Sequence, residues 1–96
     1  MKLLFCNRCG DIVALTNQER SCKCNHSRGH YTDSLNAVVY GKNAMVIGFN
    51  NSQFYSAVHG MKNLKGLTPQ AAKDIGNFKA WVCYPPHTLT VEYKEE

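Results

Sequence analysis

The fold is decided by the first 24 residues of the chain, which read MKLLFCNRCGDIVALTNQERSCKC. Their cysteines have the spacing Cys-x2-Cys-x12-Cys-x-Cys and are Cys6, Cys9, Cys22 and Cys24. Two close pairs separated by about a dozen residues can close a tetrahedron of thiolates around one Zn²⁺. Because four thiolates leave no open coordination position, the spacing predicts one structural zinc ion per chain.

Two other uses of the cysteines compete with zinc. A disulfide framework needs an oxidising compartment and usually an even number of cysteines. This chain has five cysteines, and its opening apolar stretch, Leu3 to Phe5, is too short for a secretory signal. A redox or iron–sulfur site is the remaining alternative. We therefore expect a zinc protein of the cytoplasm.

The composition is typical of one globular domain. The 96 residues are 44% hydrophobic and 19% charged, which excludes a disordered chain. No apolar run approaches the ~20 residues that span a bilayer, so we expect no membrane segment. A chain of this size forms only a small core, and a bound metal ion can add to the stability of such a domain. We expect a single domain over residues 1–96, with a zinc ribbon at 1–30 and an α+β portion at 31–96 packed with it.

Apolar and β-branched runs, alternation and turn residues predict the strands. Strands are expected at residues 3–5, 12–15, 37–40, 44–49, 78–84 and 88–93. The segments 37–40 and 44–49 are joined by a glycine-containing turn, and 44–49 is apolar on both faces, as central strands are. The last strand is expected at a sheet edge. The fold class is therefore α+β: an N-terminal zinc ribbon with four cysteine ligands, continuous with a small, mainly antiparallel sheet and one or two short helices.

Two helices are expected after the strand at 44–49. Residues 50–52 supply N-cap chemistry for the first helix. We expect it to pack on the sheet through an apolar stripe at helical spacing, which consists of Phe54, Tyr55, Val58 and Met61. A shorter helix at 70–75 follows Thr68 and Pro69 and ends at Gly76, where glycine can take the left-handed conformation.

The segment 25–33, NHSRGHYTD, carries the most varied polar chemistry and is expected to be a loop beside the metal. His26 or His30 can replace a cysteine as a ligand, although four cysteines already suffice. Arg28 is either a solvated side chain or an anion contact. Basic groups can hold phosphate oxygens, aromatic rings can stack on a base and a carboxylate can accept hydrogen bonds. The candidate ligand-binding residues are Arg8, Lys23, Arg28, His30, Tyr31 and Asp33.

Enzyme templates fit the sequence poorly. It contains no phosphate-binding Gly-x4-Gly-Lys-Ser/Thr, no Gly-x-Ser-x-Gly and no His-Glu-x2-His. Cys83 and His87 can be drawn as a nucleophile and a base, but Cys83 lies in an expected strand and is interpreted as a buried thiol. We therefore expect a protein without enzymatic activity.

Several short runs resemble a family of small bacterial and phage zinc-ribbon proteins whose activity is not established. The runs are CGDIVAL at 9–15, ERSCKC at 19–24, GHYTD at 29–33 and IGF at 47–49, and the likeness is suggested again at 78–84. Members usually carry glycine after the last cysteine, where this chain has Asn25 and His26. The resemblance implies an accessory role in phage or mobile elements, such as binding a host protein or a signalling nucleotide.

Three functions remain open. The first is a phage- or prophage-type binding protein, such as a counter-defence inhibitor, that sequesters a nucleotide-like ligand or blocks a host protein; pairing of exposed strands would make it a homo-oligomer. The second is nucleic-acid binding, for which the charge is modest: the formal +4 falls to about +2 when four thiolates hold Zn²⁺. The third is a protein–protein adaptor, which predicts an exposed apolar patch.

Overall fold

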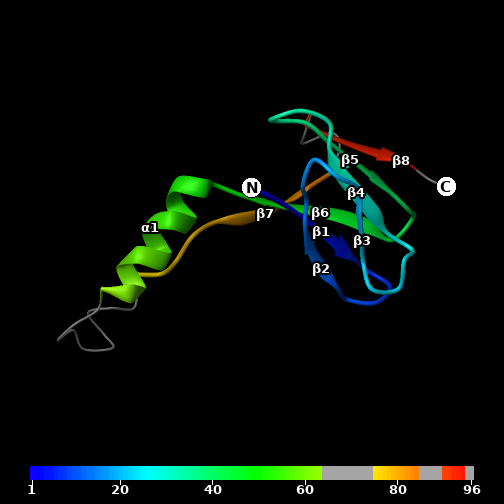
Figure 1. The fold of residues 1–96 in the computed structure, drawn as a ribbon. Coiled ribbons are helices and arrows are strands. Elements are labelled where there is room, and N and C mark those ends of the chain that lie inside the picture. The colour runs from blue at the N-terminus through cyan, green and yellow to red at the C-terminus, as the bar shows by residue number, and fades with distance from the viewer. Residues whose placement is uncertain (64–74, 85–89, 95–96) are drawn as a thin grey trace. The chain divides into compact units, whose positions relative to one another are not determined.

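The structure is a computed structural model that describes residues 1–63, 75–84 and 90–94 (Figure 1). Within these residues the chain forms eight strands and one helix. In chain order the elements are β1 (Lys2–Cys6), β2 (Ile12–Ala14), β3 (Arg20–Ser21), β4 (Arg28–Tyr31), β5 (Ala37–Tyr40), β6 (Ala44–Phe49), α1 (Asn51–Lys62), β7 (Ala80–Cys83) and β8 (Val91–Lys94). The α+β class is confirmed.

The strands form two sheets rather than the one sheet that the sequence predicted. The first sheet has the order β2-β1-β6-β7 and the second has the order β3-β4-β5-β8. In the first sheet β1 pairs antiparallel with β2 and β6. In the second, β4 pairs antiparallel with β3 and β5, whereas β5 and β8 are parallel. As expected, β6 is central and β8 lies at an edge.

The glycine-containing turn after β5 carries the chain from the second sheet to the first. Gly41 has φ +110°, a conformation that L side chains rarely adopt. A Cβ at this position would also lie 2.2 Å from the carbonyl oxygen of His26. The turn itself was predicted correctly. The sequence did not predict that this turn connects two different sheets, because turn chemistry alone does not show whether the flanking strands pair with each other.

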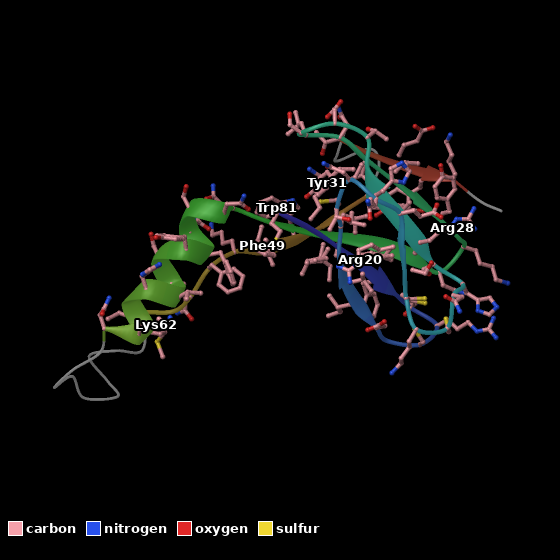
Figure 2. The ribbon with its side chains drawn as sticks, in the orientation of Figure 1. Arg20, Arg28, Tyr31, Phe49, Lys62 and Trp81 are labelled. Atoms are coloured by element: carbon pink, nitrogen blue, oxygen red, sulfur yellow. The ribbon has the colours of Figure 1, made fainter. Side chains whose placement is uncertain are left out.

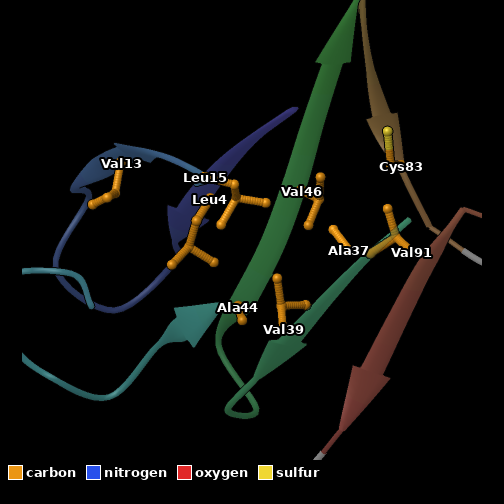
Figure 3. Close-up of a cluster of buried hydrophobic side chains, with 9 residues drawn as sticks. All are labelled: Leu4, Val13, Leu15, Ala37, Val39, Ala44, Val46, Cys83 and Val91. Carbon is orange, nitrogen blue, oxygen red and sulfur yellow. The ribbon is translucent and has the colours of Figure 1, made fainter. Parts of the chain in front are cut away.

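The core lies between the facing sides of the two sheets. Leu4 of β1 is fully buried and is paired in register with Val13 of β2 and Val46 of β6. The second sheet contributes Val39 and Val91 to the same cluster (Figure 3). Successive side chains of a strand point to opposite faces, so alternate residues of β1, β2 and β6 fill this core. Cys83 belongs to the cluster as well, which confirms the interpretation of its thiol as buried.

Two tyrosines of the second sheet bond to backbone groups of the first. The Tyr31 hydroxyl accepts a hydrogen bond from the Lys2 amide at 2.9 Å. The Tyr93 hydroxyl accepts one from the Val46 amide at 2.9 Å and donates to the carbonyl of Cys83. These hydroxyls satisfy buried backbone groups that would otherwise lose their water partners, so they hold the two sheets in register.

Contacts divide the chain into two compact units. One consists of Met1 with Phe49–Trp81, and the other consists of Lys2–Gly48 with Val82–Glu96. We call the first the helical unit and the second the two-sheet unit. The single domain expected over residues 1–96 stays a prediction.

In the helical unit, α1 buries a different line of residues from the expected stripe. Tyr55, Val58 and Met61 are exposed by 66%, 40% and 52%. Ala57 is the buried residue of the helix, and half-buried Phe54 contacts the ring of Phe78. The stripe prediction was wrong because α1 packs against the segment around Phe78, which lies far along the chain. The Asn50 side chain caps the helix by accepting from the Gln53 amide at 3.0 Å.

The later sequence predictions are tested in part. Residues 70–74 of the expected short helix lie outside the described residues, but Gly76 has φ +96° and confirms the left-handed conformation. The strand expected at 78–84 is found as β7, and 88–93 corresponds to β8, with 88 and 89 outside the description. Among the described residues, no helix has the length and apolar character needed to cross a bilayer.

Candidate metal centre

The first two cysteines lie where the chain leaves β1. Cys6 is the last residue of β1, and its carbonyl accepts the Gly10 amide at 2.8 Å, which closes a tight turn around Cys9. Gly10 has φ +76°, a left-handed conformation that glycine adopts without strain. The Cys6 amide donates to the Asp11 carbonyl at 3.0 Å. This turn places the Cys9 side chain back beside Cys6.

The second pair of cysteines lies between β3 and β4. Cys22 directly follows β3, and its carbonyl accepts the Asn25 amide at 3.0 Å. Its own amide donates to the Ser27 carbonyl at 2.9 Å. Asn25 has φ +62°, a region that asparagine tolerates better than most residues. These bonds fold residues 22–27 into a compact turn that presents Cys22 and Cys24 on one side.

The four sulfur atoms converge at the end of the two-sheet unit, where Figure 2 shows sulfur gathered near the end of β1. All four lie within 4.8 Å of one another. Cys22 Sγ and Cys24 Sγ are 3.4 Å apart, and Cys6 Sγ and Cys24 Sγ are 3.7 Å apart. Sulfur atoms bound at about 2.3 Å to a tetrahedral ion are about 3.8 Å from each other. The cysteines therefore form a group that can bind a metal ion.

The environment favours thiolate at two of the four positions. Burial raises the pKa of Cys6, but the Ser27 hydroxyl and the backbone of Cys9 and Arg8 outweigh burial and lower that pKa to about 6. Burial likewise raises the pKa of Cys22, and hydrogen bonding to Cys24 and to the Ser27 backbone lowers it overall. For Cys24, a backbone bond at His26 lowers the pKa, while burial and the other three thiols raise it to about 12. Cys6 and Cys22 are therefore the two cysteines at which the thiolate form is favoured, and a metal ion binds thiolates.

The two histidines are not among the grouped ligand atoms. His26 Nδ1 lies 2.8 Å from the carbonyl oxygen of Cys24 and donates to it. His30 lies in β4, with its Nδ1 buried. All five cysteines, including Cys83, carry free thiols, and the sulfur distances given above exceed the length of an S–S bond, about 2.05 Å.

Two of the candidate ligand-binding residues lie in the turns that carry the four cysteines. Arg8 and Lys23 are exposed and lie within the first and second cysteine pairs. The Lys23 amide donates to the Asp11 carboxylate at 2.9 Å, which ties the two turns together. Arg28 begins β4, where its Nε is 3.1 Å from the Glu19 carboxylate and its guanidinium lies 4.8 Å from the centre of the Tyr40 ring. Arg28 also lines a cavity of about 170 Å³ with Asn25, His26, Tyr40 and Gly41.

The candidate residues Tyr31 and Asp33 are separated from Arg28 in the structure. Residues 28–31 form a strand rather than the expected loop, so Arg28 and Tyr31 lie at opposite ends of β4 (Figure 2). Tyr31 packs against the core, and Lys2 Nζ lies 5.8 Å from the centre of its ring. Both Asp33 oxygens accept hydrogen bonds within the 33–36 turn, from the Leu35 and Asn36 amides and the Asn36 side chain. The bonds from Asn36 and Leu35 lower the pKa of Asp33.

Gly29 explains why this segment is a strand. A Cβ at Gly29 would lie 2.7 Å from a side-chain carbon of Val39 and 2.8 Å from the carbonyl oxygen of Val38. Glycine therefore lets β4 approach β5 closely. The sequence predicted a loop at 25–33 because this segment contains many different polar residues, and no local pattern showed that Gly29 permits a strand.

Sequence reasoning missed two residues of the metal centre. Ser27 is fully buried beside Cys6, and Asp11 accepts the amide of Lys23. Groups that hold metal ligands in place are usual around metal sites, but they have no fixed spacing from the cysteines. The one available signal was Asp11 directly after the glycine of the first turn.

No protein-family model, no curated protein and no solved structure matches this chain.

Proposed function

We propose that this chain is a non-enzymatic, zinc-stabilised protein-binding module. The zinc ion rests on the four-sulfur group, because a closed set of four thiolates at tetrahedral spacing suits Zn²⁺ and leaves no position for a catalytic water. The metal then has a structural role, and the binding surface lies elsewhere on the two-sheet unit.

One observation carries the proposal: the outer side of the first sheet has no charged residue in its paired rows. Leu4, Val13 and Val46 face the core, so their neighbours along each strand face outward. The outward residues, which we call the apolar face, are Leu3, Phe5, Ile12, Ala14, Met45, Ile47 and Val82. Ile12 and Val82 are exposed by 55% and 57%. The outward residues of the two inner strands, Leu3, Phe5, Met45 and Ile47, are half-buried.

The rows of the apolar face are continuous across the sheet. Phe5 is paired with Ile12 on one side and with Met45 on the other. Leu3 is likewise paired with Ala14 and Ile47. Scattered apolar residues are normal on a protein surface, but a contiguous and uncharged patch marks an interaction site. The adaptor hypothesis required such a patch.

The phage- or prophage-type role follows as part of the same proposal. The resemblance of the N-terminal runs to phage proteins, together with the apolar face, supports a protein that blocks a host protein by covering part of its surface. Binding energy would come mainly from burying the apolar face, at about 25 cal/mol per Å².

Site-specific photo-crosslinking tests the proposal. A photoreactive residue at position 12 lies on the apolar face, and one at position 92 lies on the second sheet as a matched control. We expect position 12, but not position 92, to crosslink one partner protein in host cells. Ile12→Glu should abolish capture of that partner, whereas Glu92→Gln should not. Equal capture by both variants, with metal retained, would reject the apolar face as the binding surface.

A second candidate is binding of a nucleotide-like ligand at the Arg28 cavity. The guanidinium of Arg28 and the ring of Tyr40 offer an anion contact and a stacking surface. The cavity volume of about 170 Å³ is below the roughly 300 Å³ at which ligand pockets begin, so it fits a phosphate group rather than a whole nucleotide. Tyr31 and Asp33 are bonded within the fold, so the site rests on Arg28 and Tyr40.

Titration with mono- and cyclic nucleotides distinguishes the two candidates. Binding that Arg28→Ala removes and Arg20→Ala keeps would favour the nucleotide candidate. Nucleic-acid binding is the weaker alternative, because the acids Asp11 and Glu19 and the thiolate centre offset the basic residues around them.

A further inference from the structure

The two sheets have four edge strands among the described residues, and three of them are protected against pairing with another chain. Arg20 donates to the Ala14 carbonyl of β2 at 3.1 Å and so covers that edge. β3 has two residues, Arg20 and Ser21, and both are polar. β8 carries Glu92 and Lys94, whose side chains are 3.7 Å apart. Short length, charge and covering groups are the usual protection of sheet edges.

The fourth edge strand, β7, is as short as β8, but it carries no charge, and within the described part of the chain no group is seen to cover its edge. Its sequence is Ala80-Trp81-Val82-Cys83, without charge or proline. Trp81 and Val82 are exposed by 50% and 57%. An uncharged, exposed edge strand is a template for another strand.

The orientation of the β7 backbone identifies the groups that remain open. The Tyr93 hydroxyl bonds both the Val46 amide of β6 and the Cys83 carbonyl, so the Cys83 carbonyl faces β6. The backbone groups of successive residues in a strand face opposite edges. The amide and carbonyl of Val82, and those of Ala80, therefore face away from β6.

We propose that two copies of the chain pair through their β7 strands, antiparallel about a twofold axis perpendicular to the first sheet. The open amide and carbonyl of Ala80 in one copy then bond to those of Val82 in the other copy, and the reverse pair forms at the same time. Such mutual pairing is what a closed twofold interface requires. This axis places the apolar faces of both copies on the same side of one continuous eight-stranded sheet. Four residues per strand bury far less than the roughly 800 Å² per partner of a standard interface, so the dimer is weak and concentration-dependent.

Sedimentation of the zinc-loaded protein from ~10 μM to ~1 mM tests this pairing, a range chosen to reach weak interfaces. Val82→Pro removes the outward amide and leaves the side facing β6 intact, because proline is tolerated on the open side of an edge strand. Val82→Thr is the matched control, since threonine keeps the amide and suits a strand. We expect the native chain and Val82→Thr to dimerise and Val82→Pro to stay monomeric with its metal bound.

If Val82→Pro fails to fold, Ala80→Pro replaces it, because proline is also accepted at the first residue of a strand. A native chain that remains monomeric up to ~1 mM would overturn the proposal. So would a dimer that both proline variants keep. Loss of the dimer in Ile12→Glu but not in the proline variants would assign association to the apolar face and would likewise reject β7 pairing.

Discussion

Ser27 has a fully buried hydroxyl in the turn that carries Cys22 and Cys24. This hydroxyl lowers the pKa of the Cys6 thiol. We expect Ser27→Ala to weaken metal binding by about 10- to 100-fold, as is usual when a group that supports a ligand is removed. Competition with a chromophoric chelator measures this, with the exposed Ser34→Ala as the control. Equal affinities for both variants would show that Ser27 does not support Cys6.

Asn25 is the residue at which backbone conformation limits the choice of side chain. At φ +62° a Cβ costs about 1 kcal/mol or more, and a β-branched residue costs most. We expect Asn25→Gly to keep or slightly raise the free energy of unfolding and Asn25→Val to lower it by about 1–2 kcal/mol. Urea denaturation of the metal-loaded protein measures both. A stable Asn25→Val variant would contradict the left-handed conformation.

Metal binding should weaken steeply in acid. The Cys6 thiolate, with a pKa of about 6, forms above that pH, whereas Cys24, with a pKa of about 12, must lose its proton to the solvent when metal binds. Protons therefore compete with the metal, and affinity rises with pH. Below about pH 6 Cys6 joins this competition, so we expect affinity to fall more than tenfold per pH unit there. Chelator competition between pH 7 and 5 measures the slope, and a flat profile would exclude a thiolate site.

At the scale of elements, α1 differs most from its sequence pattern. Phe54 has ring contacts with Phe49 and Phe78 at centroid distances of 5.0 and 4.9 Å, whereas the neighbouring Tyr55 is 66% exposed. We expect Phe54→Ala to lower the free energy of unfolding by about 2 kcal/mol and Tyr55→Ala to change it by less than about 0.5 kcal/mol. Thermal melting followed by helical circular dichroism compares them. If Tyr55→Ala lowered the free energy of unfolding more than Phe54→Ala, the result would support the predicted apolar stripe instead.

The strands were easier to predict than the helix face because a strand appears in the sequence as a short apolar or alternating run bounded by turn residues. β1, β2, β5 and β6 lie within such apolar runs, and three consecutive residues of β5 are buried. The buried line of α1 depends on Phe78, a partner that no local pattern identifies. The strand β4 was missed because its signal, Gly29, acts through close contact with β5.

At the scale of the whole molecule, the four-cysteine group takes its members from both sheets. Cys6 ends β1 of the first sheet, while Cys22 and Cys24 lie between β3 and β4 of the second. Structural zinc contributes on the order of 10 kcal/mol in small domains, which is comparable to the whole stability of a domain of this size. Removing the metal should therefore unfold the two-sheet unit.

Metal removal and cysteine replacement together test whether a metal bound by the four cysteines holds the two sheets in the folded state. We expect a strong chelator to abolish the cooperative urea transition of the two-sheet unit. Cys6→Ser should lose both the metal and that transition. Cys83→Ser, which replaces a buried thiol outside the sulfur group, should keep one metal per chain and lose only about 1–2 kcal/mol. If the metal-free chain unfolds at the same urea concentration as the metal-loaded chain, the metal does not stabilise the two-sheet unit.

The sequence by itself determined the four cysteines, the α+β class and most of the strands, because ligand spacing and short apolar runs between turn residues are local patterns. The tertiary structure decided the division into two sheets, the convergence of cysteines from both sheets, the buried line of α1 and the separation of Arg28 from Tyr31 and Asp33. It also decided that seven apolar residues from four strands form one uncharged face. Each of these depends on which distant segments lie together, and that is set by the packing of the whole core rather than by neighbouring residues.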